Sequence, residues 1–420
     1  MTFAQLGLFD PLLRTLDRLE YTLPTAVQAE AIPAILKGRD LMAAAQTGTG
    51  KTAGFALPLL HKLVHEGPRV ASNGTRSLIL VPTRELAEQV LQSFIRYGED
   101  LPLRSYAVYG GVSINPQMMA LRKGMDVLVA TPGRLLDLYR HSAVTFGQLQ
   151  VLVLDEADRM LDLGFADELQ QLFSALPRKR QTLLFSATFS DAIRNLGKDL
   201  LKDPVSIEVS PRNAAANTVT QSLIAVDKKR KTELFMHLLA ERKWGQVLVF
   251  AKTRNAVDLL VETLQANSIT ADAIHGDRPQ PARLRALARF KAAEVQVLVA
   301  TDVAARGLDI DALPHVVNFD LPIIAEDYVH RIGRTGRAGA TGEAVSLVSA
   351  DEIEQLAAIE TLINQTLRRQ EEPNFTPTHR VPVTTPGGHV VKKPKKPKKP
   401  KTATGKRNAK IHLGNWFNES

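Results

Sequence analysis

The 420-residue sequence contains no cysteine, which excludes disulfide bonds, thiolate metal ligands and cysteine nucleophiles. It also has no apolar run that approaches the roughly 18 to 20 residues of a membrane-spanning helix. The first residues, MTFAQLGLFDPLL, lack the basic segment and apolar core of a secretory signal. We therefore expect a cytoplasmic protein, monomeric and without a membrane partner.

Aromatic residues are also scarce, at 5% of the chain, which argues against extensive stacking on nucleic-acid bases as a function. Excess positive charge is also scarce over most of the chain, because acidic residues balance the Lys and Arg residues there. The net charge is +9, but residues 370–420 hold 11 Lys/Arg and 3 Asp/Glu, which leaves residues 1–369 at only +1. The hydrophobic content of 44% is that of a globular protein with room for two domains.

Short apolar segments alternate with amphipathic helical segments through residue 350. Segments that are apolar on both faces and separated by helices indicate parallel sheets covered on both sides. Helices are expected at Thr52–His65, Arg84–Tyr97, Asn255–Asn267 and Asp351–Arg369. The expected strands are Asp40–Ala45, Ser77–Pro82, Asp126–Ala130, Val151–Asp155, Gln181–Ser186, Gln221–Val226, Gln246–Ala251, Val295–Thr301 and His315–Asp320.

Nine strands are many for one sheet, and residues 209–218 combine turn formers with weak periodicity. We therefore predict an α/β protein with a first domain at 1–208, a linker at 209–218 and a second domain at 219–369. Residues 370–420 form a basic tail in which Lys392–Lys401 repeats Lys-Lys-Pro, so we expect it to be disordered. This tail is either an RNA tether that does not depend on sequence or a solvated, solubilising segment.

A phosphate-binding loop is predicted at Ala45–Thr52, AQTGTGKT, between a strand and a helix. Its glycines let backbone N–H groups approach phosphates, Lys51 reaches the β- and γ-phosphates, and Thr52 can bind Mg²⁺. The alternative is a glycine-rich turn without a ligand.

Two carboxylates follow the apolar strand in Val151–Asp158, VLVLDEAD. Asp155 is suited to holding Mg²⁺ and Glu156 to orienting the attacking water. The alternative is an N-cap and acidic first turn for the next helix. Together with the loop at Lys51, the motif indicates an NTPase.

A third motif, Tyr328–Arg337, carries three arginines in seven residues on a glycine-broken turn. If Arg334 and Arg337 reach the γ-phosphate from the second half, they act as arginine fingers. A solvated basic loop or a direct contact with RNA is an equally good reading of these residues alone.

These motifs, taken in order, resemble those of the DEAD-box RNA helicases of superfamily 2, most closely the bacterial RhlE type. The resemblance covers nearly all of residues 1–368 and implies two tandem RecA-like domains. It is carried by Phe3, YTLPTAVQ (21–28), AQTGTGKT (45–52), PTRELA (82–87), GG (110–111), TPGR (131–134), DEAD (155–158), SAT (186–188), VFAKTR (249–254), HG and QPAR (275–276 and 280–283), ATDVAARGLD (300–309) and HRIGRTGR (330–337).

The resemblance implies ATP and Mg²⁺ as cofactors. Tyr21 would stack on adenine and Gln28 would read its edge, with Phe3 in the same element and Asp309 on the ribose. Mg²⁺ would be held through Thr52 and Asp155, and Ser186 and Thr188 would couple the site to RNA separation. The expected phosphate-binding residues are Gln46, Thr47, Gly48, Thr49, Gly50, Lys51 and Thr52, and the expected catalytic residues are Lys51, Asp155, Glu156, His330, Arg334 and Arg337.

The RNA partner, single-stranded or in a short duplex, would be held by its backbone and without sequence preference. Taken singly, these residues have ordinary structural explanations, such as a helix start at Thr131-Pro-Gly and a surface charge at Arg84. The resemblance implies that RNA contacts Pro82, Arg84, Gly111, Thr131, Gly133, Arg134, Arg254, Gly276, Arg283 and Thr301.

One position departs from the family pattern, because Glu20 stands where glycine often precedes the adenine-binding aromatic. If the backbone there needs a positive φ, Glu20 carries a steric cost. The predicted activity is ATP-driven closure of two domains that separates short RNA duplexes, with ribosomal precursors or the RNA-decay machinery as possible partners. A DNA helicase of the same superfamily and a non-enzymatic RNA clamp are the alternatives.

Overall fold

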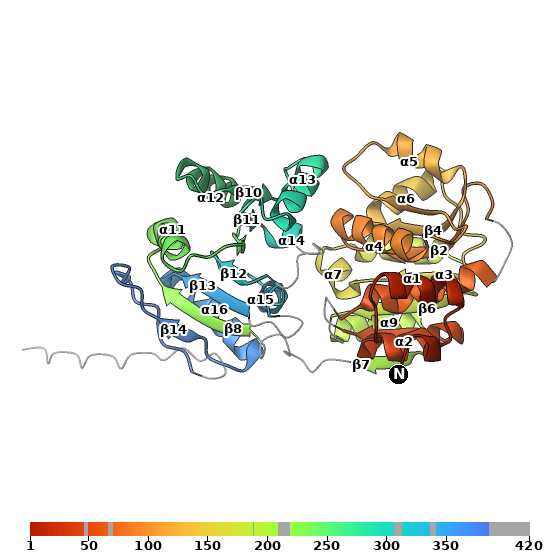
Figure 1. Ribbon diagram of the computed structural model, residues 1–420, viewed down its shortest axis with the longest axis horizontal. Helices are drawn as coiled ribbons and strands as arrows, with labels where there is room; N and C mark the ends of the chain where they lie inside the picture. Colours follow the sequence, from red (N-terminus) through yellow and green to blue (C-terminus); the bar gives the residue numbers. More distant parts are fainter. Residues whose placement is uncertain are drawn as a thin grey trace, which may run out of the picture.

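The computed structural model describes residues 1–45, 49–65, 70–187, 189–208, 219–305, 313–336 and 342–385. These residues form two α/β halves that lie side by side, the first coloured red to yellow-green and the second green to blue in Figure 1. Each half is built on a seven-stranded sheet in which neighbouring strands are parallel.

The first sheet has the strand order β3-β4-β2-β5-β6-β1-β7. Its strands are β1 (Leu41–Ala44), β2 (Thr75–Leu80), β3 (Ser105–Val108), β4 (Met125–Ala130), β5 (Val151–Leu154), β6 (Gln181–Ser186) and β7 (Val205–Glu208). Around it lie η1 (Ala4–Leu6), α1 (Asp10–Arg18), α2 (Ala26–Leu36), α3 (Lys51–His65), α4 (Arg84–Tyr97), α5 (Ile114–Leu121), α6 (Pro132–Arg140), α7 (Ala157–Asp162), α8 (Ala166–Ala175) and α9 (Asp191–Leu200).

The second sheet has the order β10-β11-β9-β12-β13-β8-β14, which is the first order with every number raised by seven. Its strands are β8 (Val219–Ala225), β9 (Val247–Phe250), β10 (Ala271–Ile274), β11 (Val297–Ala300), β12 (His315–Asn318), β13 (Gly342–Val348) and β14 (Arg368–Gln370). Around it lie η2 (Lys228–Arg230), α11 (Lys231–Glu241), α12 (Arg254–Ala266), α13 (Gln280–Lys291), α14 (Asp302–Ala305), α15 (Ala325–Ile332), η3 (Ala350–Glu352) and α16 (Ile353–Ile363). The described parts of the two halves therefore repeat one topology.

Strands that are apolar on both faces produce cores on both sides of each sheet. In β2, Leu78 and Leu80 enter one core of the first half, while Ile79 and the following Val81 enter the other. This alternation follows from the two-residue period of a strand, and it accounts for the near-continuous apolar runs in the sequence.

The same helix start follows β2 and β9. Thr83 caps α4 by accepting a hydrogen bond from Leu86 N, and Thr253 caps α12 by accepting one from Ala256 N. Each cap sets the first residue of its helix, Arg84 or Arg254, at the carboxyl end of the sheet.

All nine predicted strands are present, and the structure has five more that were not predicted from the sequence: β3, β7, β10, β13 and β14. It was also wrong about the end of the second half. The helix expected to reach Arg369 ends at Ile363, because Asn364 takes up the left-handed conformation with φ of 50°.

The basic tail also begins later than residue 370. Residues 371–385 pack against the second half, with Phe375 and Val381 buried in its cores. The Phe375 ring lies under the Arg230 guanidinium, whose carbon is 4.5 Å from the ring centroid. Thr378 is fixed by Asp227, whose carboxylate accepts hydrogen bonds from its backbone N–H and hydroxyl at 2.9 and 2.8 Å. The predicted linker and residues 386–420 lie outside the described residues.

Candidate active site and nucleic-acid interface

Three predicted motifs meet at the carboxyl ends of three neighbouring strands, β5, β6 and β1. The phosphate-binding loop follows β1, and the two carboxylates follow β5. The end of β6 joins them, because Ala45 N donates to Ser186 O at 3.0 Å and Ala187 N donates to the Asp158 carboxylate at 3.0 Å. Ser186 thus lies between the nucleotide loop and the acidic motif. Its coupling role stays a prediction, and Thr188 lies outside the described residues.

The phosphate-binding loop contains a buried cation that has carboxylates nearby but no hydrogen-bond partner among the described residues. Lys51 is the first residue of α3 and is buried, and its Nζ has no hydrogen-bond partner among the described residues. A buried ammonium group without an acceptor is costly unless an anion completes it. Of the other predicted loop residues, Thr49, Gly50 and Thr52 are described, and Gln46, Thr47 and Gly48 are not.

Gly50 is required by its surroundings. Its φ is +85°, and a Cβ there would lie 2.3 Å from the Gln28 side-chain nitrogen. Gln28 Nε2 donates to Gly50 O at 3.1 Å, while its Oε1 accepts from Thr25 N at 3.0 Å in the capping box of α2. Gln28 therefore braces the phosphate-binding loop as well as starting its helix.

Burial raises the pKa of both Asp155 and Glu156, and the positive charge of Lys51 opposes the rise. A divalent cation would favour their charged forms, so the carboxylates suit a metal-dependent site. Glu156 also has a left-handed backbone, with φ of 54°, at the start of α7. Strained non-glycine backbone of this kind is concentrated at functional sites.

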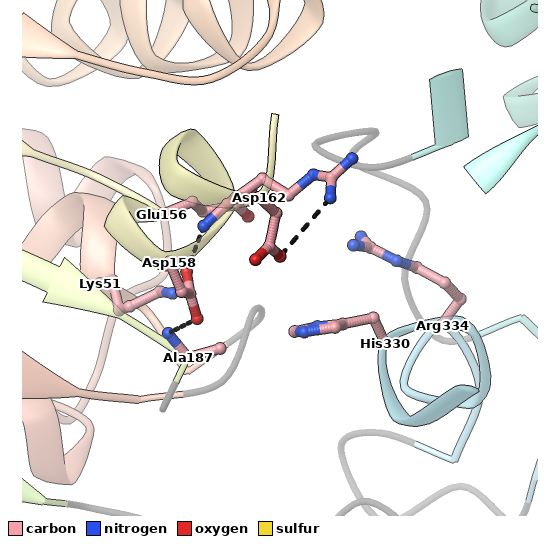
Figure 2. A pocket seen from close by; sticks show the side chains of 8 residues that line it. Lys51, Glu156, Asp158, Asp162, Ala187, His330 and Arg334 are labelled. Atoms are coloured by element: carbon pink, nitrogen blue, oxygen red, sulfur yellow. Dashed lines mark hydrogen bonds and ion pairs between the residues drawn. The ribbon is translucent and has the colours of Figure 1, made fainter. Parts of the chain in front are cut away.

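The second half completes this site. Lys51, Glu156 and Asp158 from the first half share a cavity of about 20 Å³ with His330 and Arg334 from the second, as Figure 2 shows. The charge of Arg334 is close enough to lower the pKa of Glu156, against the effect of burial. Burial lowers the pKa of His330. Arg337 and Asp309 lie outside the described residues.

Of the residues predicted to read adenine, Tyr21 lines a second, larger space between the halves, whereas Gln28 and Phe3 do not. Tyr21 and Thr52 line a cleft of about 540 Å³ that is closed on its other side by Leu284 and Leu287 of α13. The Tyr21 and Tyr97 hydroxyl groups are hydrogen-bonded at 3.2 Å. Phe3 is buried within the core of the first half, so it supports this region from within.

The predicted RNA contacts occupy matching places in the two halves. In the first half they follow β2, β3 and β4, and in the second half β9, β10 and β11. Gly111 is packed so closely on the Arg84 guanidinium that a Cβ would clash with it, whereas a Cβ on Gly276 would be in ordinary contact with the Arg254 guanidinium at 3.5 Å. The structure thus gathers Pro82, Arg84, Gly111, Thr131, Gly133, Arg134, Arg254, Gly276 and Thr301 at the carboxyl edges of the two sheets.

Arg283 differs from this group, because it bridges the two halves. Its Nη2 lies 2.8 Å from a carboxylate oxygen of Glu85 on α4, and both side chains are buried. Arg134 Nη2 donates to Val112 O at 2.9 Å, while its Nε and Nη1 have no partner among the described residues.

The sequence reading missed three residues that the structure adds. Arg159 and Asp162 of α7 line the cavity with Glu156 and His330, and Glu85 pairs with Arg283. Arg159 could have been noticed as a cation directly after the acidic motif, but a helix-surface charge gives the same pattern.

A RecA-like pair of parallel sheets, with a phosphate-binding loop on one and Arg334 from the other facing it, defines a two-domain P-loop NTPase. Residues 25–196 match the DEAD/DEAH box helicase model, and residues 230–339 match the helicase conserved C-terminal domain. The chain belongs to the DEAD-box family of ATP-dependent RNA helicases.

Two curated relatives support this membership. The chain is 43% identical over 373 residues to the ATP-dependent RNA helicase DeaD of Mycobacterium tuberculosis, covering 89% of this chain and 65% of the relative. It is 40% identical over 374 residues to the helicase CshA of Geobacillus kaustophilus, covering 89% of this chain and 79% of the relative. The narrower RhlE resemblance stays a prediction.

Two solved structures share the fold. Yeast Dbp5 bound to RNA and ADP BeF3 matches with a TM-score of 0.77 at 31% identity, covering 88% of this chain and 95% of Dbp5. A DEAD box protein from Methanococcus jannaschii matches with a TM-score of 0.52 at 35% identity, covering 88% and 99%. The TM-score is thus higher for the Dbp5 complex with RNA and ADP BeF3.

Proposed function

We propose that this protein hydrolyses ATP in the cleft between its halves and uses closure of that cleft to separate short RNA duplexes. The observation that carries the proposal is the shared cavity, in which Lys51 and Glu156 of the first half face His330 and Arg334 of the second. A site assembled from two halves is complete only when they are closed, so hydrolysis depends on closure.

Each residue of the proposed site has a separate role in ATP hydrolysis. Lys51 binds the β- and γ-phosphates, and Glu156 accepts a hydrogen bond from the attacking water and orients it. Arg334, together with Arg337, stabilises the charge that develops on the transferred phosphate. Thr52 and Asp155 would hold Mg²⁺, which when bound neutralises phosphate charge.

RNA binding is proposed at the carboxyl edges of both sheets. Arg84 and Arg254, which occupy equivalent positions in the two halves, supply donors for phosphate oxygens. Arg134 adds the two guanidinium nitrogens that have no hydrogen-bond partner among the described residues. An RNA strand held by both halves favours the closed state, as does ATP, so each increases the affinity for the other. Crosslinking RNA to the protein in cells would identify its source, with ribosomal precursors and decaying transcripts as the expected classes.

A Glu156→Gln variant tests the assignment of the catalytic site. It keeps the size of the side chain but binds the attacking water less strongly, so we expect ATP and RNA to bind with unchanged affinity and the turnover rate to fall at least a hundredfold. RNA-stimulated ATPase rates and filter-binding affinities measure the two effects. A wild-type turnover rate in this variant would contradict the role of Glu156.

A further inference from the structure

Arg159 is a buried cation that the proposed mechanism does not use. It is 7% exposed and lies on α7, three residues beyond Glu156. Its nearest carboxylate oxygen, on Asp162, is 3.7 Å from Nη1, which is too long for a hydrogen bond. Nε and Nη2 have no partner among the described residues. A guanidinium group buried with its donors unused is unfavourable unless an acceptor arrives.

The chemistry of the cavity indicates what that acceptor is. Arg159 lines it from the first half and Arg334 from the second. Figure 2 shows Lys51 and Glu156 on the side of the cavity that faces His330 and Arg334. Beside the carboxylates of Glu156, Asp158 and Asp162, the cavity thus brings together two guanidinium groups, one from each half. Their planar forks match the oxygens of a phosphate group.

We propose that Arg159 binds the inorganic phosphate that hydrolysis releases, and holds it against Arg334 until the halves separate. The proposal rests on the ATPase function proposed above. Water bonds to the γ-phosphorus of ATP beside Lys51 and Glu156, and the bond from that phosphorus to the oxygen of the leaving ADP breaks. Inorganic phosphate therefore forms at one end of this cavity. The cavity holds about one water molecule in the present arrangement, since its volume is about 20 Å³. Phosphate therefore moves between the two arginines only as the cleft begins to open.

Carboxylates around Arg159 make the interaction reversible. Burial lowers the pKa of Arg159, and three nearby carboxylates oppose this effect by favouring its charged form. They are Asp162 and Glu156 of the first half and Asp302 of the second. Asp162 is half-exposed and stays beside Arg159 when the anion has gone. Phosphate thus competes with these acids for the guanidinium, which favours release over permanent binding.

Phosphate binding by the full-length chain tests the proposal. Equilibrium binding of radiolabelled inorganic phosphate is measured in the presence of ADP and RNA, for the wild type and for Arg159→Gln, Arg159→Lys and Arg140→Gln. Arg140 is an exposed arginine of the same half that bonds to Gln171 and serves as the matched control. Loss of one charge-assisted pair should weaken phosphate binding at least tenfold in Arg159→Gln, less in Arg159→Lys, and not in the control.

Equal phosphate affinity in the wild type and Arg159→Gln would overturn the proposal. Thermal unfolding shows whether the variants fold. If Arg159→Gln does not fold, the test uses Arg159→Lys, which keeps the positive charge. A tenfold loss of ATP affinity with unchanged phosphate affinity would instead place Arg159 on the γ-phosphate of ATP and contradict the assignment to the product. Rapid-quench measurement of ATP cleavage tests the proposed ATPase function independently of phosphate binding. A wild-type chain that cleaves no ATP would contradict that function, while the measured phosphate affinities would still decide the role of Arg159.

Discussion

At the scale of single residues, Glu20 shows how a steric cost can be read from sequence. The helix α1 ends in a Schellman motif, with Glu20 N bonded to Asp17 O and Tyr21 N to Leu16 O, both at 3.0 Å. Glu20 has φ of 58°, whereas Gly38 occupies the equivalent position after α2 with φ of 74°. The expected strain at Glu20 is therefore present, and it sits beside the tyrosine that is predicted to bind adenine.

Replacing Glu20 by glycine should relieve this strain. We expect Glu20→Gly to raise the free energy of unfolding of the first half by roughly 1 kcal/mol, because glycine adopts positive φ without a Cβ clash. Urea unfolding measures the change, and Gly38→Glu should shift the midpoint in the opposite direction. A destabilised Glu20→Gly variant would show that the glutamate side chain makes a compensating contact.

At the scale of elements, the sequence predicted nine of the ten interior strands and none of the four edge strands. The interior strand that it missed is β13, which faces cores on both sides through Ala344 and Val345. β14 reads Arg-Arg-Gln and β7 reads Val-Ser-Ile-Glu, because edge strands are partly exposed and need fewer apolar residues. Periodicity could not find them. What fixes β14 is its pairing with β8, a contact between distant parts of the chain.

The same limit applies to the site. Motif order gave the residues at the strand ends, since parallel strands bring their carboxyl ends to one edge. It could not give the pairing of Glu85 with Arg283, because each residue looks like a helix-surface charge until the two halves are in place.

The end of the second half suggests two truncations with different outcomes. A chain ending at residue 385 should keep the thermal stability of the full chain, while a chain ending at 370 loses Phe375 and Val381 from the cores. We expect the shorter chain to be destabilised by several kcal/mol, about 3 of them from Phe375. Thermal unfolding compares them, and equal midpoints would contradict the packing of 371–385.

The chain that ends at residue 385 also tests the role of the basic tail. Residues 386–420 carry 10 Lys/Arg and one Glu, so removing them should weaken RNA binding mainly at low salt and leave the RNA-saturated ATPase rate unchanged. Binding titrations at several salt concentrations measure this. An equal loss of affinity at every concentration would count against an electrostatic tether.

At the scale of the whole molecule, the buried pair of Glu85 and Arg283 should stabilise the closed arrangement. Glu85→Gln leaves Arg283 buried without its counter-charge, at a cost of about 3 kcal/mol in the closed state. We therefore expect the RNA concentration for half-maximal ATPase to rise at least tenfold. Asp167→Asn on the exposed face of α8 is the control, and exchange of the two charges in Glu85→Arg/Arg283→Glu should recover part of the loss. An unchanged RNA requirement in Glu85→Gln would show that the pair does not govern closure.

The central claim is that ATP and RNA together close two repeated halves around one active site. The chain has no cysteine, so dyes can be placed at Ser174→Cys and Ala266→Cys, exposed positions in the first and second half, without competing thiols. Energy transfer between the dyes measures the separation of the halves. We predict that RNA with a non-hydrolysable ATP analogue produces a high-transfer state that neither produces alone. Energy transfer that is as high with RNA or the analogue alone as with both together would contradict this prediction. Energy transfer that does not change when both are added would contradict it as well.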